Sequence, residues 1–453
     1  MRYYSTRNKA WGVSFAQAAL TGLAPDGGLF VPEVIPPYPG PVKSSLGTMD
    51  FQDIAFETIK PYVQGEIPDP VLEDLIHAAY PFAVPLVPVG DRLVLELFHG
   101  PTAAFKDFGA RFMARAFAYL RRGEEKPLHI LVATSGDTGG AVAAGFYGIP
   151  GIAVTVLYPQ GRVSPLQERQ IAGLGGNIRA LGVEGSFDDC QRLVKTAFSD
   201  QGLQKRLALS SANSINISRL IPQSIYYAAA AGKAFAGKTD LPGDGSPWDS
   251  PHAAVPRTLT LKPGQPITWC VPSGNFGNLT AGLYAMKMGA PIRGFIAATN
   301  VNKTIPDYLA SGHYQPRPSQ ATISNAMDVG APSNFERMTA QWSLAELRSI
   351  IQGVYVTDEA TRQSIREVHH THGYFLDPHT AVAWQGIDQI RSSPIRLSDP
   401  VGLLSTAHPA KFAEIVEPLT GPVPVPPALK QVMEWKPLAQ IIPADITVLL
   451  EIL

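Results

Sequence analysis

The fold prediction rests on the stretch Leu93-Val94-Leu95-Glu96-Leu97-Phe98-His99-Gly100-Pro101-Thr102-Ala103-Ala104-Phe105-Lys106-Asp107-Phe108. Its first six residues form an apolar run typical of a strand, and apolar residues then recur at helical spacing from Phe108 to Leu120. Lys106 therefore lies at a strand-to-helix turn, between Phe105 and Phe108. Burial among aromatic rings would lower the pKa of this amine and make the neutral form available, as a lysine that forms a Schiff base requires. A solvated lysine paired with Asp107 is the alternative, and this stretch alone favours it.

The order of strand, polar turn and helix recurs from about residue 84 onward. Apolar runs at 128–133, 267–271 and 401–404 each lead into a turn rich in small and polar residues. Repeats of this kind form parallel sheets covered by helices, and ligands bind at the carboxyl ends of the strands. We therefore predict an α/β protein with two open, twisted, mostly parallel sheets that carry helices on both faces.

The same pattern divides the chain into three parts. Residues 1–82 lack it and are predicted to form a smaller N-terminal domain. Residues 83–424 would form the region with the two sheet subdomains, and residues 425–453 a C-terminal tail element. Residues 237–266 contain six prolines and little periodicity, so we expect an exposed Pro/Gly-rich insertion there.

The composition limits the partners. The formal net charge is -1 and no block of like charges occurs, so neither nucleic acid nor an anionic membrane surface is an expected partner. The only two cysteines, Cys190 and Cys270, lie far apart without metal-ligand spacing, which predicts no metal site and a reducing compartment. No signal peptide and no membrane-spanning apolar stretch are visible, and we expect a cytoplasmic protein.

Two turns that follow strands have the features of anion sites. The segments 135–139 and 273–277 each contain spaced glycines before a helix, and such turns direct backbone N–H groups and the positive helix end at an anion. The stretch from Gly274 to Asn278 is neutral and suits a tightly held phosphate. In the first turn Asp137 would repel a phosphate unless it is paired or protonated, although Ser135 and Thr138 offer hydroxyls.

The segment 211–219 provides a third polar group. If this segment enters a helix, Asn213, Asn216 and Arg219 recur every three residues and share a face suited to phosphate or carboxylate. An asparagine-capped helix with a surface arginine fits equally well. Thr406 follows a buried strand, where its hydroxyl can point into a cleft or cap the next helix.

These groups together resemble a pyridoxal 5'-phosphate enzyme of the tryptophan-synthase-β type (fold type II). More closely, the chain resembles the threonine synthase family, in its longer subgroup with an N-terminal domain. The resemblance covers most of the chain but not residues 237–266, and it is weak in the tail. It is carried by the motifs at 13–18, 99–107, 135–138, 211–219, 274–278, 324–328 and 406–412.

The resemblance implies a role for each matched position. Lys106 would hold the cofactor as a Schiff base and then act as the proton-shuttling base, and Thr406 would hydrogen-bond the pyridine nitrogen. Asp137 would lie beside the phenolic oxygen of the cofactor, where many relatives in the wider superfamily have asparagine, so a simple donor role does not suit it. The remaining positions would bind the cofactor phosphate (Gly274, Asn275, Phe276, Gly277 and Asn278) or the substrate's phosphate and carboxylate (Ser135, Thr138, Asn213, Ser214 and Arg219).

The activity that the resemblance implies is conversion of O-phospho-L-homoserine and water to L-threonine and phosphate by γ-elimination and β-addition. A serine/threonine dehydratase or a cysteine synthase on the same fold is the first alternative, and neither needs a second anion site. A non-catalytic protein that retains the pocket is the second. Whether the chain acts as a monomer or a homodimer is left open by the sequence.

Overall fold

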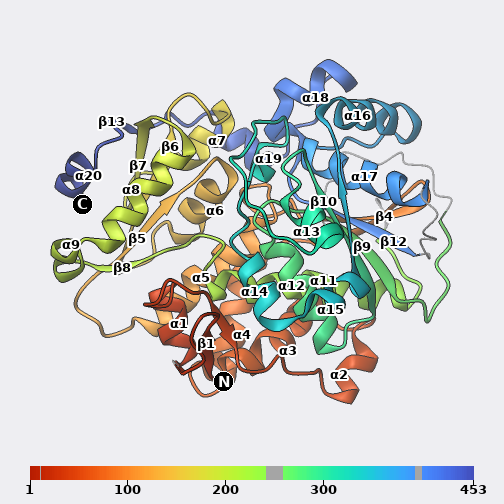
Figure 1. Ribbon diagram of the computed structural model, residues 1–453, viewed down its shortest axis with the longest axis horizontal. Coiled ribbons are helices and arrows are strands. Elements are labelled where there is room, and N and C mark those ends of the chain that lie inside the picture. Colours follow the sequence, from red (N-terminus) through yellow and green to blue (C-terminus); the bar gives the residue numbers. More distant parts are fainter. Residues whose placement is uncertain (11, 241–258, 393–399) are drawn as a thin grey trace.

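The computed structural model describes residues 1–10, 12–240, 259–392 and 400–453 of the chain. Two sheets stand side by side, the smaller on the left and the larger on the right in Figure 1, with the N-terminal elements beneath them. The predicted fold class is confirmed, since helices pack on both faces of each sheet.

The larger sheet has the strand order β11-β10-β9-β12-β4-β3, in which β3 and β4 are antiparallel and all other neighbours are parallel. Along β9, Trp269 and Val271 enter one apolar cluster and Cys270 enters another on the opposite face. This alternation buries the sheet on both faces, as parallel strands require. Its strands are β3 (Leu86–Val89), β4 (Arg92–Glu96), β9 (Ile267–Pro272), β10 (Ile292–Thr299), β11 (Ile351–Tyr355) and β12 (Val401–Ser405).

The smaller sheet is parallel throughout, with the order β13-β7-β6-β5-β8. Residues of β5 also alternate, because Ile130 and Val132 join the cluster shared with the larger sheet whereas Leu131 and Ala133 join a third cluster. The tail adds the edge strand β13 (Figure 1). The strands are β5 (Leu128–Ala133), β6 (Ile152–Pro159), β7 (Ile178–Glu184), β8 (Ala208–Ser210) and β13 (Gln440–Pro443).

The helices that cover the sheets follow the strands in sequence. They are α5 (Lys106–Leu120), α6 (Asp137–Phe146), α7 (Pro165–Ala172), α8 (Phe187–Ser199), α9 (Gln201–Arg206), α10 (Ile217–Leu220), α11 (Ser224–Phe235), α12 (Gly277–Met288), α13 (Thr304–Ser311), α14 (Phe335–Gln341), α15 (Leu344–Ile350), α16 (Asp358–His372), α17 (Pro378–Arg391), α18 (Ala413–Thr420), α19 (Pro427–Met433) and α20 (Ile446–Ile452). Three short 3-10 helices are η1 (Ile221–Gln223), η2 (Asn325–Met327) and η3 (Pro409–Phe412).

The N-terminal elements form a small antiparallel pair of strands and four helices. They are β1 (Tyr3–Ser5), α1 (Phe15–Thr21), β2 (Phe30–Pro32), α2 (Gly40–Ser45), α3 (Phe51–Val63) and α4 (Asp69–Ala79). Their apolar faces join the same buried cluster as α5 and both sheets. Residues 1–82 are therefore packed firmly onto the rest of the chain.

Residues 241–258 of the predicted insertion lie outside the described residues. Its two ends are attached to the body: the backbone N–H of Asp240 donates to the Leu86 carbonyl at 2.9 Å, and that of Gly264 donates to the Phe235 carbonyl at 2.8 Å. Among the described residues, no helix combines the length and apolar character needed to span a bilayer.

Candidate active site

Five segments that carry the predicted site residues follow the carboxyl ends of neighbouring strands. In the larger sheet β4, β12 and β9 are adjacent, and they lead into residues 97–106, 406–411 and 273–278. In the smaller sheet β5 and β8 are adjacent and lead into 134–140 and 211–219. This is the edge at which ligands bind in open parallel sheets.

A short antiparallel contact places Lys106 beside Thr406. The Phe105 N–H donates to the Thr406 carbonyl at 2.9 Å and the His408 N–H donates to the Ala103 carbonyl at 3.0 Å. The side chain of Thr406 is buried, with 5% of the residue exposed. No hydrogen bond found in the described part of the chain uses its hydroxyl, which leaves that group available to a ligand.

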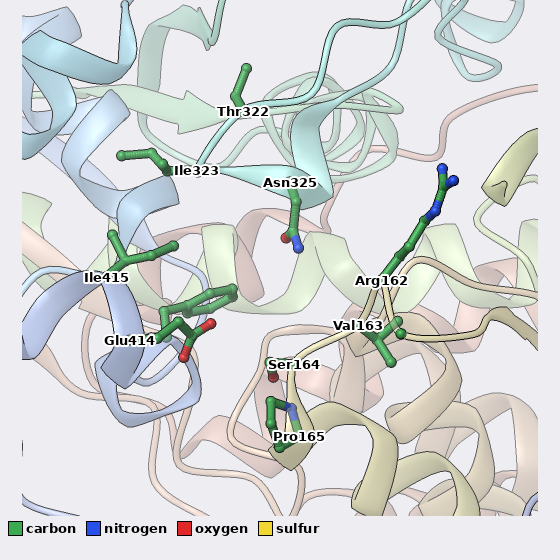
Figure 2. A pocket seen from close by; sticks show the side chains of 11 residues that line it. Arg162, Val163, Ser164, Pro165, Thr322, Ile323, Asn325, Glu414 and Ile415 are labelled. Atoms are coloured by element: carbon green, nitrogen blue, oxygen red, sulfur yellow. The ribbon is translucent and has the colours of Figure 1, made fainter.

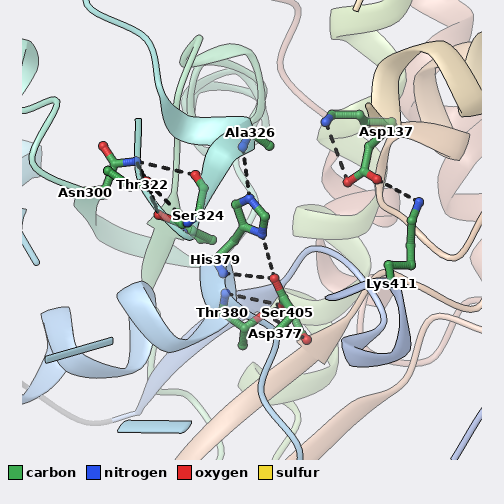
Figure 3. A network of polar contacts seen from close by, with 12 residues as sticks. Asp137, Asn300, Thr322, Ser324, Ala326, Asp377, His379, Thr380, Ser405 and Lys411 are labelled. Carbon is green, nitrogen blue, oxygen red and sulfur yellow. Dashed lines mark hydrogen bonds and ion pairs between the residues drawn. The ribbon is translucent and has the colours of Figure 1, made fainter. Parts of the chain in front are cut away.

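Lys106 faces Asp137 across the boundary between the two sheets. Its Nζ lies 3.9 Å from Asp137 Oδ2, and its side chain is 15% exposed. The other oxygen of Asp137, Oδ1, receives Lys411 Nζ at 2.8 Å and Gln167 Nε2 at 3.0 Å. Figure 3 shows the Lys411 side chain pointing at this carboxylate. Asp137 is thus paired with a cation. From the sequence, an unpaired carboxylate in this turn would repel a phosphate, and the pairing with Lys411 meets that requirement.

The charges in this group change each other's titration. Burial lowers the pKa of Lys106 to about 8, with Asp137 opposing the shift and Lys411 and Arg219 adding to it. Burial also acts on Asp137, but the two lysines outweigh it and hold the pKa of that carboxyl well below its usual range. Asp137 is therefore an anion at neutral pH, while Lys106 has a substantial neutral fraction.

Of the two aromatic residues predicted to flank the amine of Lys106, only Phe105 lies beside it. Phe105 lies beside the amine, with Lys106 Nζ 5.7 Å from its ring centroid. Phe108 instead lies in an aromatic cluster, 5.7 Å from Tyr80 and 5.2 Å from Tyr226 between ring centroids. Residues two apart in a helix point to different sides, so Phe108 fixes α5 to the N-terminal elements and does not enclose the amine.

The 274–278 loop offers unpaired backbone donors. None of the hydrogen bonds found among the described residues uses the N–H groups of Gly274 to Asn278, which precede and begin α12. The side chains of two loop residues have partners within the chain: Asn278 Nδ2 donates to the Pro272 carbonyl at 2.9 Å, and Asn275 Oδ1 accepts from the Ser333 N–H at 3.0 Å. The backbone is thus the part of this loop that is free to bind an anion.

A buried polar network supports the segment that packs against the 274–278 loop. Sequence reasoning missed this network. His379 receives the Ala326 N–H on Nε2 at 3.2 Å, and its Nδ1 lies 2.8 Å from Asp377 (Figure 3). Ala326 and Met327 in turn abut Gly274, where an added Cβ would lie 2.7 Å from the Ala326 carbonyl oxygen and 2.8 Å from Met327 Cα. The motif at 324–328 is therefore the wall against which the loop is set.

Replacing Gly274 by alanine is expected to weaken binding of the cofactor roughly tenfold to a hundredfold, because an overpacked contact costs about 1–3 kcal/mol and each 1.4 kcal/mol is about tenfold. The backbone on either side of the new methyl group cannot yield without moving the loop. The measurement is the dissociation constant of pyridoxal 5'-phosphate for the cofactor-free protein. Gly40→Ala is the matched control, since nothing lies within 4 Å of its added Cβ; equal losses in both variants would contradict the expectation.

Of the two alternatives left open for the 211–219 segment, the structure supports the asparagine-capped helix. The helix α10 starts only at Ile217, and Asn216 is its N-cap, with its amide donating to the Ala19 and Ser211 carbonyls. Asn216 is therefore committed to structure. Asn213 and Ser214 lie before the helix and are partly exposed, and no hydrogen bond found among the described residues uses their side chains.

Arg219 is buried rather than on the surface. The residue is 3% exposed and its Nη1 donates to the Ala212 carbonyl at 2.6 Å, whereas its buried Nε has no partner among the described residues. Burial lowers the pKa of this guanidinium to about 10, and its charge still acts on Lys106. A buried, incompletely bonded guanidinium is a suitable partner for an anionic ligand.

The first glycine turn is held by Thr134, which leaves two other hydroxyls available. Thr134 Oγ1 accepts from the N–H groups of Gly136 at 3.0 Å and Gly139 at 2.8 Å. Ser135 and Thr138 are partly exposed, and no hydrogen bond between described residues involves their hydroxyls. The turn can therefore present both of them to a ligand.

The two histidines near the site have structural partners. His408 is buried and caps η3 by accepting the Ala410 N–H on Nδ1 at 3.2 Å, and burial lowers its pKa to about 3. His99 Nε2 lies 2.7 Å from Glu96, whose side chain is fully buried. Both are placed as hydrogen-bonding partners of the chain, as single histidines usually are.

A pocket of about 440 Å³ lies among segments of the chain that precede α7, flank η2 and begin α18 (Figure 2). Its walls come from residues 161–165 before α7, residues 322–325 and residues 412–415. Phe412 is next in sequence to Lys411, and Asn325 is next to Ala326 of the loop wall. The pocket is thus next in sequence to Lys411 and to the wall of the 274–278 loop, although no predicted site residue lines it.

These residues fit the cofactor that the resemblance implies. An aldehyde needs an amine with a neutral fraction, which Lys106 provides. A phosphate needs several converging donors without an opposing carboxylate, which the unpaired N–H groups of the 274–278 loop provide. A pyridine ring nitrogen needs one hydrogen-bonding group. Thr406, whose backbone carbonyl accepts from Phe105 next to Lys106, carries a hydroxyl without a partner among the described residues.

Comparison with known proteins gives the class first. The family model described as "Pyridoxal-phosphate dependent enzyme" matches residues 91–235 and 253–406, so the fold and site are those of a pyridoxal-phosphate-dependent enzyme. Models described as "Threonine synthase N terminus" and "Threonine synthase, C-terminal" match residues 2–80 and 380–452. The chain belongs to the threonine synthase family.

Individual relatives agree over the whole chain. Threonine synthase of Escherichia coli (strain K12) is 41% identical over 457 residues, which cover 99% of this chain and 98% of that protein. The crystal structure of threonine synthase from Escherichia coli has a TM-score of 0.85 and covers 100% of this chain and 99% of its own. A pyridoxal-phosphate-bound threonine synthase from Brucella melitensis has a TM-score of 0.87 at 34% identity, covering 100% of this chain and 98% of its own. The predicted family and cofactor are confirmed.

Proposed function

We propose that this chain converts O-phospho-L-homoserine and water to L-threonine and phosphate, the last step of threonine biosynthesis, as a phosphate-eliminating lyase that depends on pyridoxal 5'-phosphate. The observation that carries this proposal is one mostly buried amine, Lys106, in a site that contains two groups able to bind anions. The 274–278 loop is one of them and the buried guanidinium of Arg219 is the other. A dehydratase or cysteine synthase substrate would need only the first.

The residues toward the cofactor have separate tasks. The neutral amine of Lys106 would hold the cofactor through its aldehyde carbon. The N–H groups of Gly274, Asn275, Phe276, Gly277 and Asn278 bind the phosphate, and the hydroxyl of Thr406 binds the ring nitrogen. Asp137, held as an anion, would be placed beside the phenolic oxygen and could accept but not donate a hydrogen bond.

The residues toward the substrate surround its two anionic ends. Arg219 neutralises the phosphate that must leave, because developing charge on a leaving group is stabilised most by fixed donors in a site that excludes water. Four neutral side chains complete the set for phosphate and carboxylate: Ser135, Thr138, Asn213 and Ser214.

Proton transfer is the second task of Lys106. Bound pyridoxal 5'-phosphate supplies an electron sink for negative charge at the substrate Cα. Lys106 would remove the Cα proton, a Cβ proton would leave next and phosphate would depart from Cγ. A proton would then be added at Cγ, water would add at Cβ, and a proton would return to Cα. An amine with a pKa near neutral pH suits both the removal and the return of a proton.

The test compares two substrates with the purified holoenzyme. O-phospho-L-homoserine should give phosphate and L-threonine in equal amounts. Ammonia released from L-threonine at a comparable rate, with no phosphate released from O-phospho-L-homoserine, would favour a dehydratase and contradict the proposal. A protein that binds the cofactor and turns over neither compound would favour the non-catalytic alternative.

Covalent capture of the cofactor should depend on pH in a way that reports on Lys106. Because only the neutral amine attacks, the capture rate of the cofactor-free protein is expected to rise with pH and level off above a midpoint of about 8. Below the midpoint the rate should rise about tenfold per pH unit. The measurement is the rate at which the absorption band of the bound cofactor appears. A rate that still rises steeply near the ordinary lysine pKa would show that the amine is not perturbed.

We also propose a domain division, a cellular location and a kind of partner for this chain. A division at residues 82 and 424 is supported by the N-terminal family model, which ends at residue 80, and by the position of β13 and α20 at the edge of the smaller sheet. A reducing, cytoplasmic location is supported by the two buried, unpaired cysteines. The near-neutral charge supports action on a small molecule without nucleic acid or a membrane.

A further inference from the structure

Lys411 has no part in the catalytic and binding roles proposed above, although it is a buried charge of the site. Its side chain is 0% exposed, and its Nζ lies 2.8 Å from Asp137 Oδ1 and 2.8 Å from the Thr102 carbonyl oxygen. A buried ammonium is costly unless it is paired. We propose that Lys411 is a positioning residue of this site, whose ammonium holds the carboxylate of Asp137 and so prevents it from closing onto Lys106.

The two oxygens of Asp137 are used unequally. Lys411 and Gln167 both bind Oδ1, whereas Oδ2 faces Lys106 Nζ at 3.9 Å. A separation of 3.9 Å is too long for a hydrogen bond, so the amine of Lys106 is near the carboxylate but not bonded to it. Its lone pair stays available for the aldehyde and for a substrate proton.

Removing the ammonium of Lys411 would reverse this arrangement. Asp137 would keep only the amide of Gln167 and the nearby Lys106 as partners, and a buried carboxylate is strongly attracted to the remaining cation. The carboxylate and Lys106 would then form a close ion pair. Lys106 would stay protonated to higher pH and would capture the cofactor more slowly.

The other charged groups around Lys106 also favour its protonated form once Lys411 is lost. Asp137 faces it from α6, Lys411 from η3 and Arg219 from α10. Its neighbour Asp107 is fully buried, and Lys411 and Arg111 act on its carboxyl. Loss of Lys411 therefore removes a cation from a group that also contains two carboxylates, which favours the protonated form of Lys106.

The turn before Lys106 would survive the loss. The Thr102 carbonyl also accepts from Gln170 Nε2 at 3.0 Å, and Thr102 remains bound to Asp107 through its N–H at 2.9 Å and its hydroxyl at 2.8 Å. Methionine matches the unbranched stem of lysine and suits a buried position. Lys411→Met is therefore expected to fold.

The inference rests on the proposed role of Lys106, and its test separates the two. Cofactor-free wild type and variants are mixed with pyridoxal 5'-phosphate over a range of pH, the capture rate is recorded, and the product is reduced with borohydride and mapped to the modified lysine. Lys411→Met should move the pH midpoint upward by about one unit, and so slow capture at neutral pH about tenfold. A general structural defect would lower the rate at every pH without moving the midpoint.

Two further variants complete the test. Asp137→Asn combined with Lys411→Met removes both charges, and its midpoint should return to the wild-type value or below. Lys233→Met, which breaks the partly exposed pair with Asp240 at 2.7 Å, should keep the wild-type midpoint. The inference is overturned if Lys411→Met keeps the wild-type midpoint while Lys106 is still the modified residue, or if the double variant is shifted upward. Wild type that is modified elsewhere, or not at all, would overturn the role of Lys106 itself.

Discussion

Replacing Lys106 by alanine is expected to lower turnover of O-phospho-L-homoserine by at least about 10³-fold, because general acid–base catalysis alone contributes about 10²–10⁴-fold. The variant loses both the amine that captures the cofactor and the base that moves protons at Cα and Cβ. The rest of the site should remain. The 274–278 loop keeps its N–H groups, and Asp137 keeps Lys411 at 2.8 Å.

The measurement has two parts. Phosphate release gives the loss of turnover, and borohydride reduction should leave no cofactor attached to the chain although equilibrium dialysis still detects binding. A small primary amine added to the medium should restore part of the activity. Lys233→Ala is the control, since this lysine is ion-paired to Asp240 and belongs to none of the five segments of the site. Retained covalent attachment in Lys106→Ala would show that another lysine holds the cofactor.

The sequence predicts those parts of the fold that are local. The apolar runs at 93–98, 128–133 and 267–271 give strands because strands of a doubly covered sheet are apolar on both faces. The patterns Ser164-x-x-Gln167 and Ser186-x-x-Asp189 predict capping boxes, and both helices begin with one. Periodicity does not identify β8, which has three residues, or β11, which begins at Ile351 directly after α15.

For the candidate site, too, the sequence predicts only what is local. Lys106, the 274–278 loop and Thr406 follow strands that are far apart in sequence, and only their adjacency in one sheet brings them together. The pairing of Asp137 with Lys411 joins residues that follow strands of different sheets, so nothing in either local sequence predicts it. The spacing of Asn213, Asn216 and Arg219 left an anion-binding face and an asparagine-capped helix equally open, and only the structure shows that Asn216 is the cap of α10.

Arg219 separates the proposed substrate from the alternatives, so its replacement is the second decisive change. Arg219→Met should lower kcat/KM for O-phospho-L-homoserine about 10²-fold, as removal of a fixed charge-stabilising donor does elsewhere. The cause is the loss of a buried cation whose Nε has no partner among the described residues. The dissociation constant of pyridoxal 5'-phosphate should stay near the wild-type value, because the 274–278 loop binds that phosphate.

The matched control for Arg219→Met is Arg348→Met. Arg348 also donates to backbone carbonyls, those of Leu309 at 2.7 Å and Ala310 at 2.9 Å, but it lies on α15 away from the site. Steady-state kinetics and cofactor titration of both variants give the comparison. Arg219→Met could instead weaken binding of the cofactor and leave kcat/KM unchanged at saturating cofactor. That result would show that Arg219 binds the cofactor phosphate. The site would then have one anion position, and a substrate without a phosphate would fit it as well.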